Sequence, residues 1–175
     1  MVGEMQNKAA AWSEEYERQM LGILILDPEL IDDTAVKLRG EEFYDLRHVN
    51  LYNLLCDMRD RQIPVTVPSV LEEAKSLDGG RMAIGDVPYV IGMVNNAASP
   101  SYSPALATIK KKAKLRDYQS AAHLILQTIS GEGDDDFRLS EAGSTLTPLL
   151  HDADAGSEAT TKDIVREALG QIESA

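Results

Sequence analysis

Several residue types are scarce in this sequence, and each scarcity excludes a class of structure. The single cysteine, Cys56, excludes an intramolecular disulfide and is typical of a protein kept in a reducing compartment. Aromatic residues make up only 5% of the chain while 43% of its residues are hydrophobic, so we expect an aliphatic core. No run of alternating β-branched and polar residues reaches a useful length, which argues against strands and predicts an all-α fold.

Basic residues are also scarce. Lys and Arg total 17 against 29 Asp and Glu, which gives a net charge of −12. Such a surface repels phosphate, so the composition argues against nucleic-acid binding by the chain as a whole and fits protein partners or solubility. The longest apolar run, Met20 to Leu26, is too short to span a bilayer, and the N-terminus lacks the layout of a secretion signal. We therefore expect a cytoplasmic protein without a membrane partner.

Motifs for catalysis or cofactor binding are absent from the sequence. It has no Gly-x-x-x-x-Gly-Lys-Ser/Thr segment, so no loop is available to cradle the phosphates of a nucleotide. His48, His123 and His151 are scattered without metal-ligand spacing, and no Ser, His and acid arrangement can be argued from spacing. The acidic run 134–136 is interpreted as a solvated turn. We expect no catalytic residue, no cofactor and no metal in this chain.

The first helix is predicted over residues 13–26. Ser13 can cap it, and acidic residues fill its first turns, where the helix dipole favours negative charge. Asp27-Pro28 ends it. Apolar residues at helical spacing form a stripe that we expect to be buried, namely Trp12, Tyr16, Met20 and Leu24.

Further helices complete a predicted helical head. Gly40 is expected to stop the second helix, and the Asn-, Ser- and Pro-rich stretch 95–104 is expected to be a loop. Apolar periodicity and capping residues place helices at 29–39, at 48–61, from Thr66 onward and after the cap Asp86, with a single turn at 41–44.

A helical hairpin is predicted after the head. A long helix over 104–130 carries a regular apolar stripe, and a shorter helix or two half-helices follow over 137–150. A stripe this regular is typical of a helix that packs on another helix along its length. The interface residues that we expect for self-association or primase docking are Leu115, Tyr118, Ala122, Ile125, Ile129, Leu146, Leu149 and Leu150.

The end of the chain is predicted to be a flexible linker followed by one more helix, over residues 160–173. The apolar face of that helix has no domain of its own to pack on, so we expect it to dock on another domain or another chain. Its docking residues are Ile164, Val165, Ala168, Leu169 and Ile172. The predicted organisation is an arm (1–12), a head (13–103), a hairpin (104–151), and a linker with its helix (152–175).

Two features carry alternative interpretations. The only basic cluster consists of Lys110, Lys111, Lys112, Lys114 and Arg116. At about 100° per residue these side chains point all around the helix, which favours a solvated helix start over contact with DNA or with an acidic partner. His48 is interpreted as a packed, hydrogen-bonded histidine rather than a functional one.

Two blocks of the sequence resemble the N-terminal domain of DnaB-type replicative DNA helicases. The first runs from Glu15 to Pro28 and matches the family's Glu-x-Glu and Leu-Gly elements and its closing Asp-Pro. The second comprises Phe43-Tyr44 and His48. Looser matches continue through the basic helix to the terminal helix. Asp86 replaces a family glycine, which, with the acidic turn, suggests a divergent member encoded by a phage or a plasmid.

The resemblance implies a role in assembly and recruitment. In this family the hairpins pair and the heads touch, so that six copies build a collar as a trimer of dimers. Primase docks on the collar, and the linker helix packs on the motor domain of a neighbouring subunit. A helicase loader is a further possible partner, and DNA is contacted only indirectly. ATP and Mg²⁺ are expected only in the motor domain, which this sequence does not contain.

Three hypotheses follow, in order of preference. The first is the collar and linker of a replicative helicase that acts in a bacterial cell or a phage-infected host. The second is a stand-alone mimic of the helicase collar that binds a replicative helicase and regulates or loads it. The third is a helical DNA-binding domain that uses the segment Lys110 to Arg116.

Overall fold

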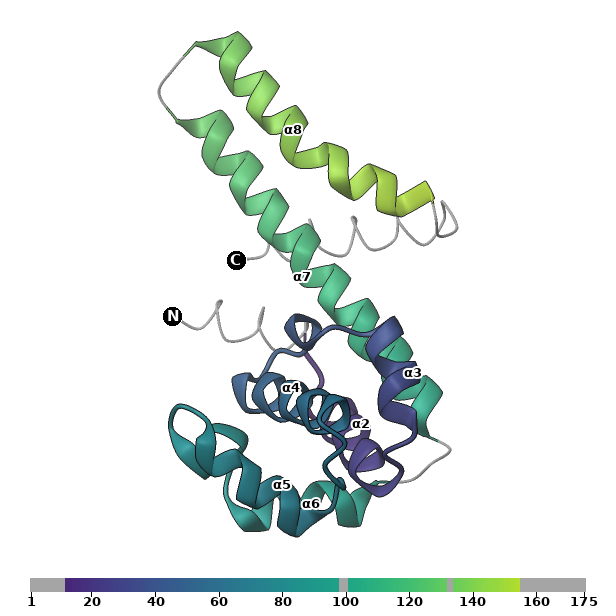
Figure 1. Ribbon diagram of the computed structural model, residues 1–175. Coiled ribbons are helices and arrows are strands. Elements are labelled where there is room, and N and C mark those ends of the chain that lie inside the picture. Colours follow the sequence, from purple (N-terminus) through teal and green to yellow (C-terminus); the bar gives the residue numbers. More distant parts are fainter. Residues whose placement is uncertain (1–11, 98–100, 132–133, 155–175) are drawn as a thin grey trace. The chain divides into compact units, whose positions relative to one another are not determined.

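A computed structural model describes residues 12–97, 101–131 and 134–154, and for 148–154 it describes the backbone alone. All regular structure in these ranges is helical, which confirms the all-α prediction. In chain order the elements are α2 (Glu14–Leu26), α3 (Leu30–Lys37), η1 (Gly40–Glu42), α4 (Leu46–Asp60), α5 (Val67–Glu73), η2 (Ala74–Ser76), η3 (Gly80–Ile84), α6 (Val87–Asn96), α7 (Tyr102–Ser130) and α8 (Asp135–Asp154) (Figure 1).

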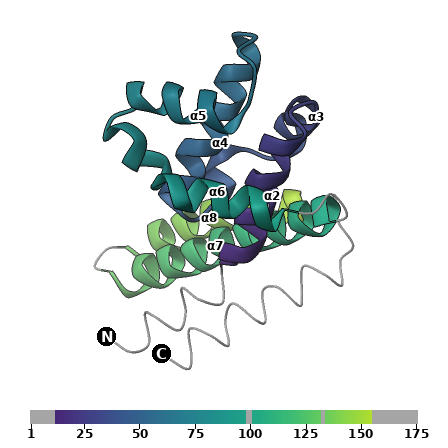
Figure 2. The same cartoon turned by 90° about the horizontal axis from the view of Figure 1, so that it is seen from below.

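Helix α2 is the central element of the head. Its residues from Met20 to Ile25 are all buried, and it contacts both α4 and α6 (Figure 2). Burial on every side is typical of a helix that other elements surround. The approach to α6 requires a glycine, because a Cβ at Gly22 would lie 2.3 Å from the carbonyl oxygen of Met93. Trp12 and Tyr16, which we expected in the buried stripe, are only partly buried.

The caps differ in how well the sequence predicted them. Thr66 Oγ1 accepts a hydrogen bond from Ser69 N at 3.3 Å, and Asp86 Oδ1 accepts one from Tyr89 N at 2.9 Å, so both predicted caps are confirmed. Ser13 occupies the N-cap position of α2 in an extended conformation, but its hydroxyl makes no capping bond. The Ser13 carbonyl accepts the first bond of the helix, from Glu17 N at 3.2 Å, as an N-cap carbonyl ordinarily does.

The prediction that Gly40 stops the second helix is wrong. Helix α3 ends at Lys37, where Leu38 takes an extended conformation and buries its side chain in the core. Gly40 instead begins η1. The space beside it is filled by Asn53, whose Oδ1 would lie 2.3 Å from a Cβ at this position. The glycine therefore permits a close contact with α4 and does not end α3.

The first half of α7 belongs to the head. Ala105 and Ile109 are buried in the hydrophobic core. The Tyr102 hydroxyl lies 2.9 Å from Thr34 Oγ1, and Lys110 Nζ donates to the Lys37 carbonyl at 2.9 Å. The two compact units of the chain accordingly divide between Ala113 and Lys114, inside α7, whereas we predicted that the head ends at residue 103.

The hairpin consists of the second half of α7 and the whole of α8, which run side by side (Figures 1 and 2). Arg138 Nη1 donates to the carbonyls of Ile129 and Gly131, at 3.0 and 3.1 Å, and so ties the start of α8 to the end of α7. Helix α8 is continuous and extends beyond the predicted 137–150 at both ends. The predicted terminal helix, 160–173, lies outside the described residues.

Candidate functional site

The fold splits the predicted hairpin stripe into buried and exposed parts. Leu115 and Tyr118 are buried in the folded chain, Ala122 and Ile125 are partly buried, and Ile129 is half exposed. The first two residues are therefore core positions rather than free interface positions. On α8, Leu146 is exposed. Leu149 and Leu150 belong to α8, but their side chains lie outside the described part.

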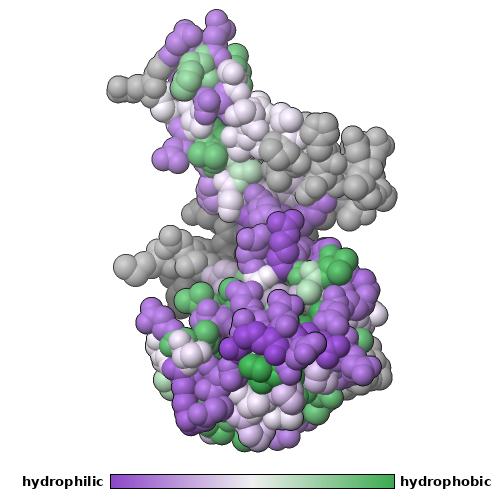
Figure 3. Space-filling view, viewed as in Figure 1, coloured by the Kyte–Doolittle hydropathy of each residue, from purple (hydrophilic) through white to green (hydrophobic). Residues whose placement is uncertain are grey.

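Further apolar side chains of the hairpin are exposed that the sequence analysis did not select. Leu124 and Leu126 on α7 and Phe137 and Leu139 on α8 are between 49% and 67% exposed. Figure 3 shows several apolar side chains on the visible surface of the hairpin. They were not among the predicted interface residues, because they fall off the main stripe of α7 or near the start of α8. Exposed apolar residues that share one face mark candidate interaction surfaces.

The basic cluster is engaged in local contacts. Lys110 is used in the bond to the carbonyl end of α3, where a cation is favoured by the helix dipole. Lys114 Nζ lies 5.9 Å from the centre of the Tyr118 ring. Lys112 and Arg116 are partly buried and also have interaction partners, and Lys111 is exposed. The structure therefore does not bring these five cations together on one face.

The predicted docking residues of the terminal helix cannot be placed. Ile164, Val165, Ala168, Leu169 and Ile172 all lie outside the described residues, and their role in docking stays a prediction.

A buried polar junction joins three helices of the head. Glu17 of α2 and His48 of α4 are 2% and 0% exposed, and Glu17 Oε2 lies 2.6 Å from His48 Nδ1. His48 Nε2 lies 2.8 Å from the hydroxyl of Tyr89, on α6. Glu17 also accepts a bond from Tyr44 N at 2.8 Å. The interpretation of His48 as a packed, hydrogen-bonded residue is confirmed, whereas no local sequence pattern indicated that Glu17 would be its partner.

The outer side of this junction carries two arginines. The guanidinium carbons of Arg47 and Arg18 lie 4.3 and 4.9 Å from the centre of the Tyr89 ring, in cation–π geometry. Burial raises the pKa of Tyr89 to about 12, so its hydroxyl keeps its proton at neutral pH. Gly85, at φ +96°, leaves the space that this ring occupies, since a Cβ there would lie 2.5 Å from a ring carbon.

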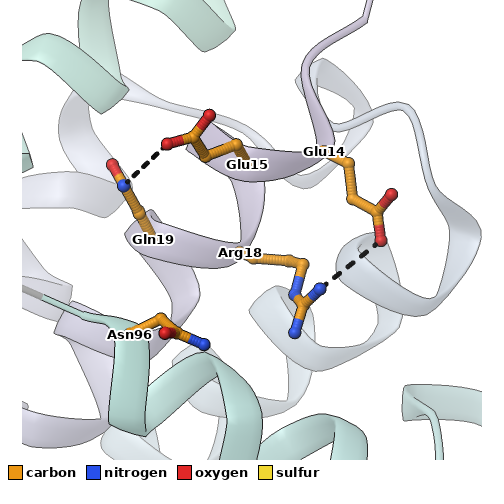
Figure 4. Close-up of a pocket in the computed structure, with 5 residues that line it drawn as sticks. All are labelled: Glu14, Glu15, Arg18, Gln19 and Asn96. Atoms are coloured by element: carbon orange, nitrogen blue, oxygen red, sulfur yellow. Dashed lines mark hydrogen bonds and ion pairs between the residues drawn. The ribbon is translucent and has the colours of Figure 1, made fainter.

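A shallow polar hollow of about 520 Å³ lies beside Arg18. Figure 4 shows its lining, with side chains from α2 facing Asn96 at the end of α6. Gln19 Nε2 donates to Glu15 at 3.5 Å, and Arg18 lies 3.8 Å from Glu14. These groups already pair with one another, so the hollow offers no set of free catalytic groups. In the described ranges, no three His, Cys, Asp or Glu side chains gather to hold a metal ion, and no helix could cross a membrane.

Comparison with known protein families identifies the domain. The family model for the DnaB-like helicase N terminal domain matches residues 9–112, which is more than half of the chain. The chain belongs to the DnaB-like helicase N-terminal domain family. The resemblance carried by Glu15 to Pro28 and by the Phe43 to His48 segment is therefore confirmed.

The curated relatives are replicative DNA helicases. The chain is 23% identical over 167 residues to the replicative DNA helicase DnaC of Bacillus subtilis, covering 91% of this chain and 35% of the relative. It is 27% identical over 168 residues to DnaB of Geobacillus stearothermophilus, covering 92% and 36%. With DnaB of Mycobacterium leprae it shares 30% identity over 114 residues, covering 63% and 18%. The chain thus spans about a third or less of the length of these relatives.

Solved structures show the same fold. The N-terminal domain of DnaB helicase from Mycobacterium tuberculosis matches with a TM-score of 0.70 at 22% identity, covering 77% of this chain and 96% of that one. A DnaB-like replicative helicase, solved in a study of its interactions with primase, matches with a TM-score of 0.63 at 22% identity. That match covers 78% of this chain and 31% of the helicase.

The DnaB-like signature residues have structural roles in the head. Gly22 permits the contact between α2 and α6, Phe43 is buried in the core, and Glu17 and His48 form the buried junction. The signature therefore identifies the scaffold of this domain, and none of these residues forms part of the exposed surface of the hairpin.

Proposed function

We propose that this chain is the assembly and recruitment part of a DnaB-type replicative helicase, which acts in DNA replication without carrying out catalysis itself. The family match supports the domain type, and the exposed apolar face of the hairpin carries the proposal. Leu126 and Ile129 of α7 and Leu139 and Leu146 of α8 are 43–67% exposed. In a chain with net charge −12, apolar side chains that are this exposed are unfavourable in water unless another surface covers them.

These four residues form one hairpin face. Leu139 and Leu146 are seven residues apart, which places them on one side of α8, next to the buried Ala142. Leu126 and Ile129 are three residues apart on α7. On each helix these residues lie to one side of the line along which α7 and α8 touch. Because the two helices run antiparallel, the pair on α7 and the pair on α8 lie on the same side of the hairpin. A second copy of the hairpin is the occupant that we propose, because identical apolar faces are self-complementary about a two-fold axis.

The wider assembly follows from the same proposal. Dimers formed through the hairpin would build a hexamer as a trimer of dimers in the full-length protein. A primase is the proposed partner of the assembled collar, supported by the likeness to a helicase whose interactions with primase have been solved. The segment 160–173 would dock on the motor domain of a neighbouring subunit. ATP and Mg²⁺ would belong to that motor domain, and the protein would act in the cytoplasm, where a helicase loader is a further possible partner.

A stand-alone collar mimic is the second candidate. It would use the same hairpin face to bind a replicative helicase instead of a second copy of itself. The reading frame downstream of this sequence distinguishes the two, because a phosphate-binding loop soon after residue 175 is expected only for the helicase.

Sedimentation velocity over a concentration series tests hairpin pairing. We expect the wild-type chain to dimerise and the double variant Leu126→Asp/Ile129→Asp to remain monomeric, because a buried charge without a partner opposes association. Leu124→Asp is the matched control, since Leu124 is also half exposed but lies on the opposite side of α7. A wild-type chain that stays monomeric at the highest concentration, or a double variant that still dimerises, would contradict the proposal.

A further inference from the structure

Three glycines lie inside the described α-helices, and two of them have a neighbour that needs the space beside them. A Cβ at Gly22 would lie 2.3 Å from the Met93 carbonyl oxygen, and one at Gly92 would lie 3.2 Å from Arg18 Nη2. Gly143 in α8 differs, because no atom of the described residues lies within 4 Å of a Cβ built there. The two glycines of the head mark close contacts inside the chain, whereas the described part of the chain makes no such contact at Gly143.

The conformation of α8 does not require a glycine at residue 143. The residue lies well inside the helix Asp135–Asp154, so it does not cap either end. It also lacks the positive φ that favours glycine in turns. Glycine weakens a helix relative to alanine, because it loses more backbone freedom on folding. Its remaining use is to let another backbone come close, and here that backbone belongs to a second molecule.

Gly143 lies in the exposed apolar face of the hairpin. It follows Leu139 by four residues and precedes Leu146 by three, so the three residues share one side of α8. Arg138 bonds to the Ile129 carbonyl, which fixes the level at which the two antiparallel helices meet. About one turn further along each helix, Gly143 comes to the level of Leu126 on α7. The glycine therefore forms a gap in the middle of this face.

The charges around Gly143 suit a second copy of this acidic chain. From residue 139 to residue 147 only Glu141 is charged, and it lies two positions from Gly143, about 200° around the helix. The remaining carboxylates at the start of α8, from Asp134 to Asp136, lie at the tip of the hairpin. In an antiparallel pair the two tips point to opposite ends, so that no acidic group faces another across the gap.

We propose that Gly143 is the point at which α8 of one copy crosses α8 of a second copy, in antiparallel orientation. This inference rests on the hairpin pairing proposed above and deepens it. The two-fold axis passes beside Gly143, so the gaps of the two copies face each other and the helix backbones touch there. Leu139 and Leu146 pack on either side of the crossing. Gly143 thereby sets the register of the pair, because a larger side chain holds the helices apart.

The variant Gly143→Leu tests the crossing by sedimentation velocity. It adds apolar area to the face, yet we expect the Kd of the dimer to rise about tenfold or more, because overpacking of a close contact is unfavourable. Ser144→Leu is the matched control, since Ser144 is exposed and lies three residues after Glu141, on the side of α8 away from the face. Its Kd should stay within about twofold of the wild-type value.

Circular dichroism separates the crossing from a folding defect. At concentrations at which the chain is monomeric, Gly143→Leu should be at least as helical as the wild type, because leucine favours a helix over glycine. A Kd that rises in a fully helical chain then reports the contact between copies.

A disulfide cross-link tests which residue faces Gly143. The variant is Gly143→Cys in the full chain, with the single native cysteine removed by Cys56→Ala. Two cysteines can be bridged only when their Cα atoms lie within about 7 Å. On oxidation with diamide we expect a covalent dimer. Ser144→Cys in the same background is the control and should remain a single chain.

Two results would overturn the crossing while leaving hairpin pairing in place. The first is a Gly143→Leu variant that dimerises as tightly as the wild type or more tightly, which would mark a face that only needs apolar area. The second is a Gly143→Cys chain that dimerises without forming the cross-link. A wild-type chain that stays monomeric is a different result, which overturns hairpin pairing and the crossing together.

Discussion

Gly22 illustrates how a single residue sets the spacing of two helices in this domain. The backbone of α6 approaches α2 so closely that a methyl group at residue 22 would meet the Met93 carbonyl carbon at 2.7 Å and its oxygen at 2.3 Å. Backbone atoms cannot turn aside as a flexible side chain can. A side chain at this position therefore has to push the two helices apart, and the core between them loses contacts.

We predict that Gly22→Ala destabilises the head by about 2 kcal/mol or more, since overpacking of a rigid core has costs of this size. Urea denaturation followed by circular dichroism measures the change. Gly143→Ala is the matched control, because nothing lies within 4 Å of a Cβ at Gly143 in α8. That variant should be neutral or gain up to about 1 kcal/mol from helix propensity. Equal stabilities of the two variants would show that the helices can separate freely.

At the scale of elements, the start of α4 depends on a charged cap. Asp45 Oδ1 accepts a hydrogen bond from Arg47 N at 2.9 Å, and the Asp45 carboxylate also pairs with the Arg47 guanidinium. The hydrogen bond from that guanidinium is the main reason why the pKa of Asp45 lies below its usual value, and burial opposes it. A carboxyl with a lowered pKa in the folded state stabilises the fold at neutral pH. That stabilisation is lost as the pH falls through the folded pKa.

We predict that Asp45→Asn reduces the loss of stability between about pH 5 and pH 2, because Asn keeps the cap but has no charge to lose. At neutral pH the substitution should cost less than about 1 kcal/mol, given that Arg47 is partly exposed to solvent. Denaturant titrations across this pH range provide the measurement. Asp57→Asn, which removes an exposed partner of Arg61, is the control. Its free energy of unfolding should fall with pH as steeply as that of the wild type. An unchanged profile in Asp45→Asn would show that the lowered pKa contributes nothing to folding.

At the scale of the whole molecule, charge limits what the chain can bind. Its net charge is −12, and Lys110, the first residue of the only basic cluster, is committed to the end of α3. The phosphate backbone of DNA requires several free cations on one surface. The hypothesis of a DNA-binding domain built on Lys110 to Arg116 therefore has little support from the arrangement of these side chains.

We predict no measurable binding of the chain to single- or double-stranded DNA at low salt. Fluorescence anisotropy of a labelled oligonucleotide at about 50 mM salt is the measurement, because electrostatic binding is strongest under such conditions. Binding that weakens steeply with added salt and is abolished by Lys111→Glu would restore the DNA-binding hypothesis, since Lys111 is exposed and, unlike Lys110, is not used in the bond to the end of α3.

The sequence alone determined the class of the fold, most of its helices and its family. Periodicity and local caps do this because they involve neighbouring residues, as at Thr66 and Asp86, whose bonds reach only three positions along the chain. It also identified His48 as a packed histidine. The signature from Glu15 to Pro28 marked the correct scaffold because its residues are required by the packing of the core.

Tertiary structure alone decided which residues are buried together and which surface stays free. Glu17 and Tyr89 are 31 and 41 positions from His48, and no local pattern connects them. In the same way, a stripe on α7 cannot reveal that Leu115 and Tyr118 are covered within the chain while Leu126 is exposed. Burial depends on what long-range folding places against each side of a helix, whereas helical periodicity specifies only which side is apolar.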